Sequence, residues 1–402
     1  MDVTIHPGRA CGTVAAPPSK SCAHRLLLGA ALAEGTSFIR GISLSQDVQA
    51  TLDCIAALGA SVRFDGETAQ IFGGLNPSEN VLFPCRESGS TLRFLLPLTL
   101  VRKNTAVFTG TPRLIERGIS VYETLFAEKG ISVVKSEKSV TVSGQLLPGT
   151  YTVSGGVSSQ FITGLLYALP LLDGNSALRV LPPVESRPYI DLTVDVLRKY
   201  GIQIFEIEPG FFQIPGRQRY RSLDLRVEGD WSNAAPLLAL SRLGGDVAVT
   251  GLDSESMQAD RVCLQALDRL EMQDALIDLS DCPDLGPVLF TVAAAKHGAV
   301  FTGTRRLRMK ESDRAAAMAE ELSKFGIQTA ISGNAVTVFS GQLYAPKTPL
   351  SGHNDHRIVM ALALLCTLTG GTITGAEAID KSYPGFFADL RSLGIRAEEE
   401  TG

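Results

Sequence analysis

The sequence predicts an α/β protein made of six copies of one repeat, arranged as two lobes of three repeats each. Three segments recur in the same order: an apolar helix, a short β-branched strand ending near a glycine, and a second helix that a tight turn joins to another strand. Helical spacing of apolar residues predicts the helices, and runs of Val, Ile, Thr and Phe bounded by glycine predict the strands. Such alternation is typical of helices packed against sheets.

The turn after each second helix is the clearest of these features. It occurs in phrases such as CIAALGASVRF and ELSKFGIQTA, and its turn residues are Gly59, Gly130, Gly201, Met272, Gly326 and Gly394. Successive turn residues lie 71, 71, 71, 54 and 68 positions apart. The single short interval marks a trimmed repeat between the fourth and fifth turns.

The first helix of each repeat is strongly apolar. These helices are expected at residues 25–33, 91–101, 161–172, 234–243, 285–296 and 358–369. We expect one lobe at residues 18–227 and a second lobe at residues 1–17 together with 228–402. The strand expected at residues 3–6 has no partner within the first repeat, so we expect it to cross to the second lobe.

The amino-acid composition limits which partners the protein is expected to bind and in which compartment it is expected to lie. The chain has 402 residues, 37 basic and 42 acidic groups and a net charge of −5, which argues against nucleic acid or an anionic membrane as the main partner. No apolar run approaches the roughly 20 residues of a membrane span, and the first residues do not resemble a targeting signal. Seven cysteines without a C-x-x-C pair favour a reducing, cytoplasmic location over a disulfide framework or a zinc site.

Basic residues recur where the predicted helices begin. A cation at a helix N-terminus opposes the helix dipole by roughly 0.3–1 kcal/mol, so its recurrence needs a reason. We interpret the series as a site for anions, because helix N-termini and Arg or Lys side chains both bind them. The basic residues in these positions are Lys20, Arg25, Arg117, Lys310, Arg314, Arg357 and Lys381.

The acidic residues near these helix starts divide into two groups. Asp47 is expected to be a helix cap, and Asp313 a structural residue at a helix start. Asp284 and Glu311 interrupt the basic series, so they are candidates for proton transfer. Neither G-x-x-x-x-G-K-[ST] nor a G-x-G-x-x-G after a strand is present, which favours small anions over nucleotides.

Nine motifs, in order, resemble those of the 5-enolpyruvylshikimate-3-phosphate synthase family, bacterial type. They are PPSKSCAHRLLLGAAL, ESGSTLRF, TGTPRLIERG, VSSQFITGLLYALPLL, SRPYIDLT, VEGDWSNAA, MKESDR, NDHRIVMALAL and DKSYPGFF. They run from about residue 17 to residue 387, and KESDR with NDHR is the most specific combination. The resemblance implies a two-lobed inside-out α/β barrel of six βαβαββ-like repeats with its active site in the interlobe cleft.

The resemblance also implies a reaction and a role for each matching residue. The family transfers the enolpyruvyl group of phosphoenolpyruvate to the 5-hydroxyl of shikimate 3-phosphate by addition and elimination, with neither a metal nor an organic cofactor, and as a monomer. Asp284 resembles the acid that deprotonates the hydroxyl, and Glu311, with Lys20, resembles the group that moves a proton at the methylene carbon. The residues that resemble shikimate 3-phosphate ligands are Lys20, Ser21, Arg25, Ser158, Ser159, Gln160, Ser186, Asp284 and Lys310. Those that resemble phosphoenolpyruvate ligands are Lys20, Gly89, Arg117, Gln160, Arg314, Arg357 and Lys381.

Some positions depart from the family pattern. Glu87 stands where an amide is usual in the best-known members, and Gly118 where proline is common. We expect such changes to alter anion affinity rather than the reaction. Gly89 keeps the small residue that family analogy associates with sensitivity to glyphosate.

Three other interpretations compete with this assignment. An enolpyruvyl transferase acting on UDP-N-acetylglucosamine has the same fold and donor, but that relative carries a cysteine in the segment that reads TGTPRLIERG here. A non-catalytic repeat scaffold would not need cations at its helix starts. A metal site at His353 and His356 lacks a cysteine or a third histidine at ligand spacing.

Overall fold

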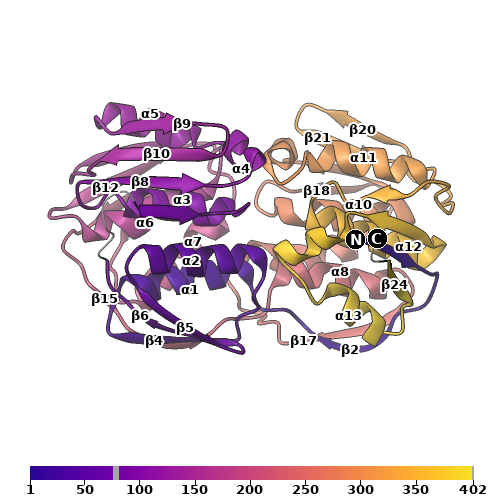
Figure 1. Ribbon diagram of the computed structural model, residues 1–402. Coiled ribbons are helices and arrows are strands. Elements are labelled where there is room, and N and C mark those ends of the chain that lie inside the picture. The colour runs from indigo at the N-terminus through magenta and orange to yellow at the C-terminus, as the bar shows by residue number, and fades with distance from the viewer. Residues whose placement is uncertain (76–80, 401–402) are drawn as a thin grey trace. The chain divides into compact units, whose positions relative to one another are not determined.

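The computed structural model describes residues 1–75 and 81–400, which form two compact units (Figure 1). We call Lys20–Glu228 the first lobe, and Met1–Ser19 together with the chain from Gly229 onward the second lobe. The chain therefore passes twice from one unit to the other.

Within its described residues, the first lobe contains three four-stranded sheets with one shared topology. In each sheet the first two strands are parallel and the remaining pairs are antiparallel. In spatial order the strands are β16 (Asp224–Arg226), β4 (Thr36–Arg40), β6 (Thr68–Phe72) and β5 (Ser61–Asp65); β7 (Val81–Pro84), β8 (Asn104–Thr109), β10 (Ser139–Gly144) and β9 (Ser132–Lys135); and β11 (Thr150–Ser154), β12 (Ser176–Leu181), β14 (Phe211–Ile214) and β13 (Phe205–Glu208). A further parallel pair joins β3 (Ala33–Glu34) to β15 (Tyr220–Arg221).

Two kinds of helix alternate with these strands. The first kind is the crossover that precedes the second strand of each sheet: α1 (Lys20–Leu32), α3 (Gly89–Leu98) and α6 (Ser159–Ala168), the last extended by the 3-10 turn Leu169–Leu171. The second kind leads into the hairpin: α2 (Gln46–Ala57), α5 (Ser120–Glu128), with the short α4 (Pro112–Arg117) before it, and α7 (Arg187–Lys199). Helices α1 and α3 lie between the sheets in Figure 1 and are buried on nearly every side.

The second lobe repeats this arrangement with one incomplete sheet. Its complete sheets are β18 (Ala275–Asp278), β19 (Ala299–Thr302), β21 (Ala335–Val338) and β20 (Thr329–Ser332); and β22 (Leu350–Ser351), β23 (Gly371–Thr374), β1 (Asp2–Ile5) and β24 (Ala397–Glu400). The incomplete sheet is the parallel pair β17 (Asp246–Thr250) and β2 (Cys11–Ala15). The trimmed repeat inferred from the turn spacing corresponds to this two-stranded sheet.

The helices of the second lobe also fall into two sets. The apolar crossovers are α8 (Trp231–Arg242), α10 (Gly286–Ala295) and α12 (His356–Thr369), and the second helices are α9 (Cys263–Leu270), α11 (Arg314–Lys324) and α13 (Phe386–Ser392). Four 3-10 helices complete the lobe: Ala259–Val262, Pro283–Leu285, Arg305–Met309 and Ala376–Lys381.

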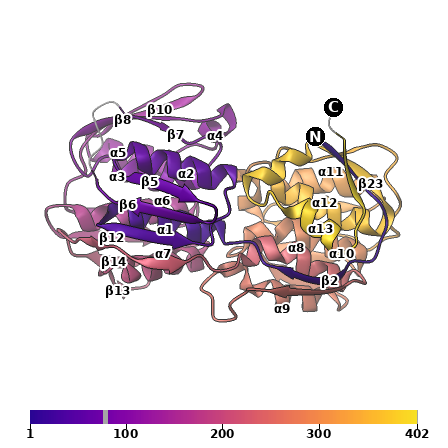
Figure 2. The same cartoon turned by 60° about the horizontal axis from the view of Figure 1, so that its bottom comes forward.

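The N-terminal strand lies in the second lobe, where the sequence analysis placed it. Strand β1 pairs antiparallel with both β23 and β24 and so fills the third position of the last sheet (Figure 2). Its alternate residues Val3 and Ile5 are buried in the core of the second lobe. Strand β16 closes the first lobe in a similar way, because it comes from the lobe's far end to pair with β4.

Glycine recurs at these turns because the backbone there has a positive φ. Gly59, Gly130, Gly201, Gly326 and Gly394 all have positive φ, the conformation that ends a helix at low cost only for glycine. The fourth repeat has Met272 at this position, and its positive φ falls instead on Asp274, two residues later.

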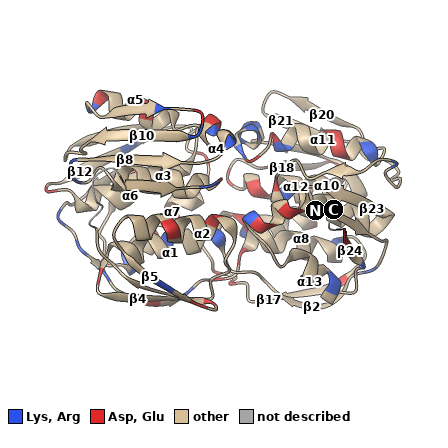
Figure 3. Cartoon of the chain, in the orientation of Figure 1, with Lys and Arg blue, Asp and Glu red and all other residues tan. Residues whose placement is uncertain are grey.

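The predicted first helices are confirmed, but most begin earlier than the apolar pattern indicated. Helix α1 begins at Lys20 rather than at Arg25, and α12 at His356 rather than at Ile358. The difference arises because the first turn of each helix is polar, and apolar periodicity cannot detect it. Beyond this turn the charged residues of the crossover helices are Arg25 of α1, Arg93 of α3 and Arg242 of α8. Most of the length of these helices is uncharged (Figure 3), which suits their burial in the two cores.

Within residues 1–75 and 81–400, no helix has the length and apolar character needed to cross a bilayer.

Gly164 tests how tightly α3 and α6 pack. A Cβ atom there would overlap the carbonyl oxygen of Arg93 and the hydroxyl of Tyr122. We expect Gly164→Ala to lower the free energy of unfolding of the first lobe by about 1–3 kcal/mol, measured by urea denaturation. Gly385→Ala is the control, since its Cβ would lie 3.8 Å from the nearest side-chain atoms. Equal stability of the two variants would contradict this packing.

Candidate active site

Arg314 is the centre of a charged cluster in the second lobe. Its side chain is 1% exposed at the start of α11, and four hydrogen bonds tie it to three carboxylates. Nη1 donates to Asp284 at 2.6 Å, Nη2 to Glu311 at 2.8 Å, and Nε and Nη2 to Asp355 at 2.8 and 3.2 Å. Although burial opposes the charge, Asp355, Glu311 and Asp284 raise the pKa of Arg314, so this residue stays a cation.

Asp284 lies in the 3-10 turn before α10, close to two cations. Oδ1 lies 2.9 Å from Lys310 Nζ and 2.6 Å from Arg314 Nη1. Burial raises the pKa of Asp284, but the charges of Lys310, Arg314 and Arg357 outweigh it and hold the pKa well below its usual range. Burial lowers the pKa of Lys310, against the opposing effect of Asp284.

Asp355 connects this cluster to α12. It is fully buried, caps α12 by accepting a hydrogen bond from the backbone N–H of Arg357 at 2.9 Å, and accepts another from Ser312 at 3.0 Å. The guanidinium of Arg357 is buried and donates to the Ser232 carbonyl at 2.6 Å and to its hydroxyl at 2.5 Å. Its Nε–H has no acceptor among the residues described here.

The loop before α12 holds two further groups. Lys381 Nζ donates to the Asn354 carbonyl at 2.6 Å, and His353 Nε2 lies 2.9 Å from Glu321 Oε1. His353 and Asn354 have positive φ, at 48° and 50°, so the loop is held in a conformation that few residues adopt.

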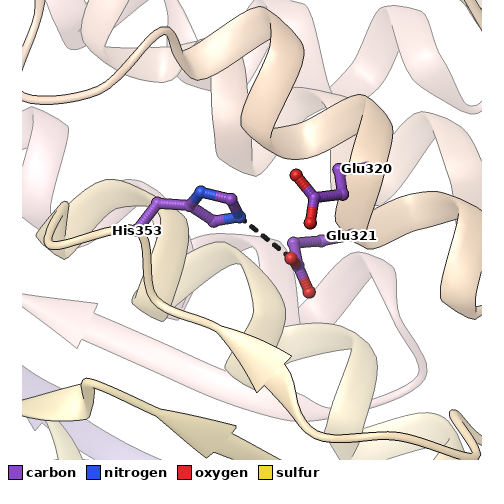
Figure 4. A group of neighbouring side chains, drawn as sticks. All are labelled: Glu320, Glu321 and His353. Carbon is purple, nitrogen blue, oxygen red and sulfur yellow. Dashed lines mark hydrogen bonds and ion pairs between the residues drawn. The ribbon is translucent and has the colours of Figure 1, made fainter.

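Glu320, Glu321 and His353 offer three atoms close enough for one metal ion (Figure 4). Glu321 is already engaged, because its oxygens lie 3.0 and 2.9 Å from Lys324 Nζ and one of them accepts from the Ser351 N–H at 3.0 Å. A metal cation would have to displace the charge of Lys324, so we interpret the cluster as an ion-pair network that fixes the loop.

Lys20 begins α1 in the first lobe and pairs with Asp47. Its Nζ lies 2.8 Å from Asp47 Oδ2, and both side chains are mostly buried, at 16% and 12% exposed. The expectation that Asp47 is a cap is wrong, because Ser45 caps α2 and Asp47 lies in its first turn. Asp313, in contrast, caps α11 through the Ala316 N–H, as expected for a structural residue.

Arg25 is buried between α1 and α7. Its Nε donates to Thr193 at 2.9 Å, Nη1 to the Ser21 carbonyl at 2.8 Å and Nη2 to the Tyr189 carbonyl at 3.1 Å. Ser186 is the buried residue before α7 and has φ of 56°. These contacts bring Ser21 and the start of α7 to the same guanidinium.

Gly89 lies beside two guanidinium groups at the start of α3. A Cβ there would be 3.3 Å from both Arg117 Nη2 and Arg93 Nη1 and 3.5 Å from Gln160 Oε1. Arg93 Nη1 donates to Gln160 Oε1 at 2.6 Å, and Gln160 Nε2 donates to the Ser90 hydroxyl at 2.9 Å. The start of α6 belongs to this group, since Ser158 caps it and accepts from the Gln160 N–H at 3.3 Å, with Ser159 next to it.

Gly118 has a backbone conformation that the proline common at this position in the family could not adopt. Its φ is 74°, which proline cannot adopt, and its carbonyl accepts from Arg93 Nη2 at 3.1 Å and Nε at 3.3 Å. The backbone after Arg117 therefore differs from the one a proline would impose.

The sequence analysis missed two residues that organise these clusters, Arg93 and Asp355, and gave Asp47 the wrong role. Arg93 and Asp355 lie within recognised motifs, but the spacing of motifs does not indicate which side chains pair in the folded protein. The predicted residues otherwise fall into one connected group in the second lobe and into groups around Lys20, Arg25 and Gly89 in the first.

Comparison with known proteins identifies relatives along the whole chain. Residues 5–390 match the family model of EPSP synthase (3-phosphoshikimate 1-carboxyvinyltransferase). The 3-phosphoshikimate 1-carboxyvinyltransferase of Clostridium kluyveri is 38% identical over 423 residues, covering 99% of this chain and 98% of the relative. That of Clostridium acetobutylicum is 38% identical over 422 residues, covering 98% and 97%.

Solved structures share the fold. An EPSP synthase from Acinetobacter baumannii has a TM-score of 0.79 at 22% identity and covers 99% of this chain and 100% of its own. The enolpyruvyl transferase NikO from Streptomyces tendae has a TM-score of 0.78 at 19% identity, covering 99% and 98%. The expected two-lobed inside-out α/β fold is confirmed, and the relatives favour the shikimate reaction over the UDP-N-acetylglucosamine and scaffold alternatives.

The His353–Glu321 pair predicts a pH dependence of stability. Its hydrogen bond with Glu321 raises the pKa of His353, so the charged pair stabilises the fold fully below the unfolded value of 6.5. This contribution is lost as the pH rises through the folded pKa of His353. We expect the urea midpoint of the wild type to fall between pH 6 and pH 8.5 by more than that of His353→Gln.

His297→Gln is the control for this comparison, because His297 is exposed and lies outside the pair. A His353→Gln variant whose midpoint follows the same pH dependence as the wild type would show that the pair adds nothing.

Proposed function

The chain belongs to the EPSP synthase family and is an enolpyruvyl transferase of the shikimate pathway, and we propose that two sets of its residues, one in each lobe, carry the reaction. The reaction moves the carboxyvinyl group of phosphoenolpyruvate to the 5-hydroxyl of shikimate 3-phosphate and releases phosphate. One observation supports the assignment most: Asp284 Oδ1 lies within 2.9 Å of both Lys310 and Arg314, and these cations hold the pKa of Asp284 well below its usual range against the effect of burial.

The proposed ligands of shikimate 3-phosphate combine cations with hydroxyl groups. Hydroxyls and an amide at the start of α6 suit a phosphate, since they add donors to backbone N–H groups there. Buried Arg25 fixes Ser21 and the start of α7, where Ser186 lies. The full proposed set is Lys20, Ser21, Arg25, Ser158, Ser159, Gln160, Ser186, Asp284 and Lys310.

The proposed ligands of phosphoenolpyruvate are mainly guanidinium and ammonium groups. Gly89 has no side chain, so an anion can approach the guanidinium of Arg117 closely. Among the described residues, the hydrogen bonds of Arg314 use four of its five N–H donors, which leaves one on Nη1, and Arg357 offers its Nε–H. The full proposed set is Lys20, Gly89, Arg117, Gln160, Arg314, Arg357 and Lys381.

Asp284 is the proposed base that takes the proton of the 5-hydroxyl. Its low pKa makes it a weak base in the free protein, because Lys310 and Arg314 stabilise its charge. When the phosphate of shikimate 3-phosphate binds Lys310, the field of that cation on Asp284 is partly neutralised. The pKa of Asp284 then rises, so that substrate binding itself strengthens the base.

Glu311 and Lys20 are the proposed proton carriers at the methylene carbon of phosphoenolpyruvate. A proton delivered there lets the 5-oxygen bond to the adjacent carbon and gives a tetrahedral adduct. Removal of a proton from the same carbon and departure of phosphate then restore the double bond. Arg314 orients Glu311 for this exchange through the 2.8 Å hydrogen bond to Oε2.

We also propose that the chain works as a monomer in the cytoplasm, without nucleic acid. Its seven cysteines are all free, and six of them are buried, which fits a reducing compartment.

The substrate assignment predicts which mixture releases phosphate. Phosphate should appear when purified protein meets phosphoenolpyruvate and shikimate 3-phosphate together, and neither substrate alone should suffice. Release with UDP-N-acetylglucosamine in place of shikimate 3-phosphate, and none with shikimate 3-phosphate, would overturn the assignment. A colorimetric phosphate assay decides between them.

Glu311→Gln tests the proton-transfer role without changing the size of the side chain. We expect kcat to fall about 10²- to 10⁴-fold, the usual range for loss of a general acid or base, while the thermal unfolding midpoint changes little. Glu320→Gln is the control, since Glu320 is exposed on α11, the helix that begins just after Glu311. Turnover within about twofold of wild type in Glu311→Gln would remove Glu311 from this role.

A further inference from the structure

A row of four buried side chains connects three helices of the first lobe. His24 of α1 lies with Nδ1 2.7 Å from Thr51 Oγ1 of α2, which lies 2.7 Å from Thr91 Oγ1 of α3. Thr91 Oγ1 donates to Ser88 Oγ at 2.7 Å, and Ser88 is the N-cap of α3. All four are at most 3% exposed, so water does not compete for these bonds.

The hydrogen atoms in this row can be arranged in only one direction. Each threonine hydroxyl has a single hydrogen to donate. Thr91 gives its hydrogen to Ser88, so Thr51 must donate to Thr91. Thr51 then has no hydrogen left for His24, and Nδ1 of the imidazole must carry the proton that completes the row.

The other ring nitrogen of His24 is consequently an acceptor. Burial, together with the charges of Lys20 and Arg25, lowers the pKa of His24 well below its usual value, so the ring is neutral. Nε2 is buried and has no hydrogen-bond partner among residues 1–75 and 81–400. The neutral tautomer with the proton on Nδ1 is therefore the one in which both nitrogens fit their surroundings without an orphaned donor.

We propose that His24 is a positioning residue for the transfer reaction: through Thr51 and Thr91 it fixes the N-cap Ser88, and thereby the place of Gly89 against Arg93 and Arg117. This inference rests on the proposed assignment of Gly89 to phosphoenolpyruvate. Gly89 follows Ser88 directly, and a Cβ there would stand only 3.3 Å from both guanidinium groups. A small displacement of the helix start therefore changes the space in which the anion meets Arg117.

Two pairs of variants separate this role from general stability. His24→Asn keeps an N–H donor close to the position of Nδ1, whereas His24→Gln moves its amide toward the position of Nε2. We expect KM for phosphoenolpyruvate to stay within about twofold of wild type in His24→Asn and to rise about tenfold in His24→Gln, with kcat little changed in both.

Thr51→Val breaks the row at its middle and should raise the same KM about tenfold, the factor expected for one lost buried hydrogen bond. Thr99→Val is the matched control, because Thr99 is buried at the other end of α3 and donates only to the Leu96 carbonyl. It should leave KM unchanged even where it lowers the unfolding midpoint.

Gly89→Ala distinguishes failure of this inference from failure of the proposed function. A raised KM for phosphoenolpyruvate in Gly89→Ala, with wild-type values in Thr51→Val and His24→Gln, overturns the role of His24 alone. An unchanged KM in Gly89→Ala overturns the assignment of Gly89 and the kinetic role of His24 with it.

The tautomer of His24 can also be read out directly, without kinetics. Nitrogen-15 NMR of the five histidines should show one ring with its proton on Nδ1 and none on Nε2 from pH 5.5 to pH 8, and its signal should be absent from His24→Asn. A proton on Nε2 in that ring would overturn the inferred direction of the row.

Discussion

The buried guanidinium of Arg314 is the interaction on which the second lobe's site depends. A charge removed from water must be compensated, and Arg314 is compensated by Asp284, Glu311 and Asp355, each on a different segment. These bonds fix the start of α11, the turn before α10 and the start of α12 relative to one another. The same charge keeps Asp284 ionised, so one residue supplies both the geometry and the electrostatics of the proposed base.

The first lobe uses the same principle with different partners. Lys20 is balanced by Asp47, Arg25 by hydroxyl and carbonyl oxygens, and Arg93 by Gln160 and the Gly118 carbonyl. Cations near helix starts are thus stabilised by the protein before any substrate binds. Anionic substrates then replace some of these protein partners and bind cations that are already in position. Few side chains have to move during the reaction. The His24 row fixes the helix start beside Gly89 in a comparable way, although its members are neutral.

The repeated sequence pattern made the fold predictable, but it did not reveal which charged side chains pair with one another in the site. The recurring turns, five of them at a glycine, and the apolar helices are local patterns, so the sequence alone predicted the order of elements, a trimmed repeat between the fourth and fifth turns and the destination of β1. Asp47 was misassigned because a carboxylate in a first helical turn resembles a cap, and only the fold brings Lys20 to it. Arg93 and Asp355 were overlooked for the same reason: their partners, Gly118 and Arg314, are distant in sequence, and their pairing is a property of the tertiary structure.

The charge state of Asp284 in the free protein tests the central claim most directly. Carbon-13 NMR of the aspartate carboxyl groups, with Asp284 assigned by comparison with Asp284→Asn, would follow its titration as the pH is lowered. The account predicts that this signal shows no protonation above about pH 4, the ordinary aspartate value, because Lys310 and Arg314 hold the proton off. A carboxyl that titrates above that value would show that the cluster does not control Asp284.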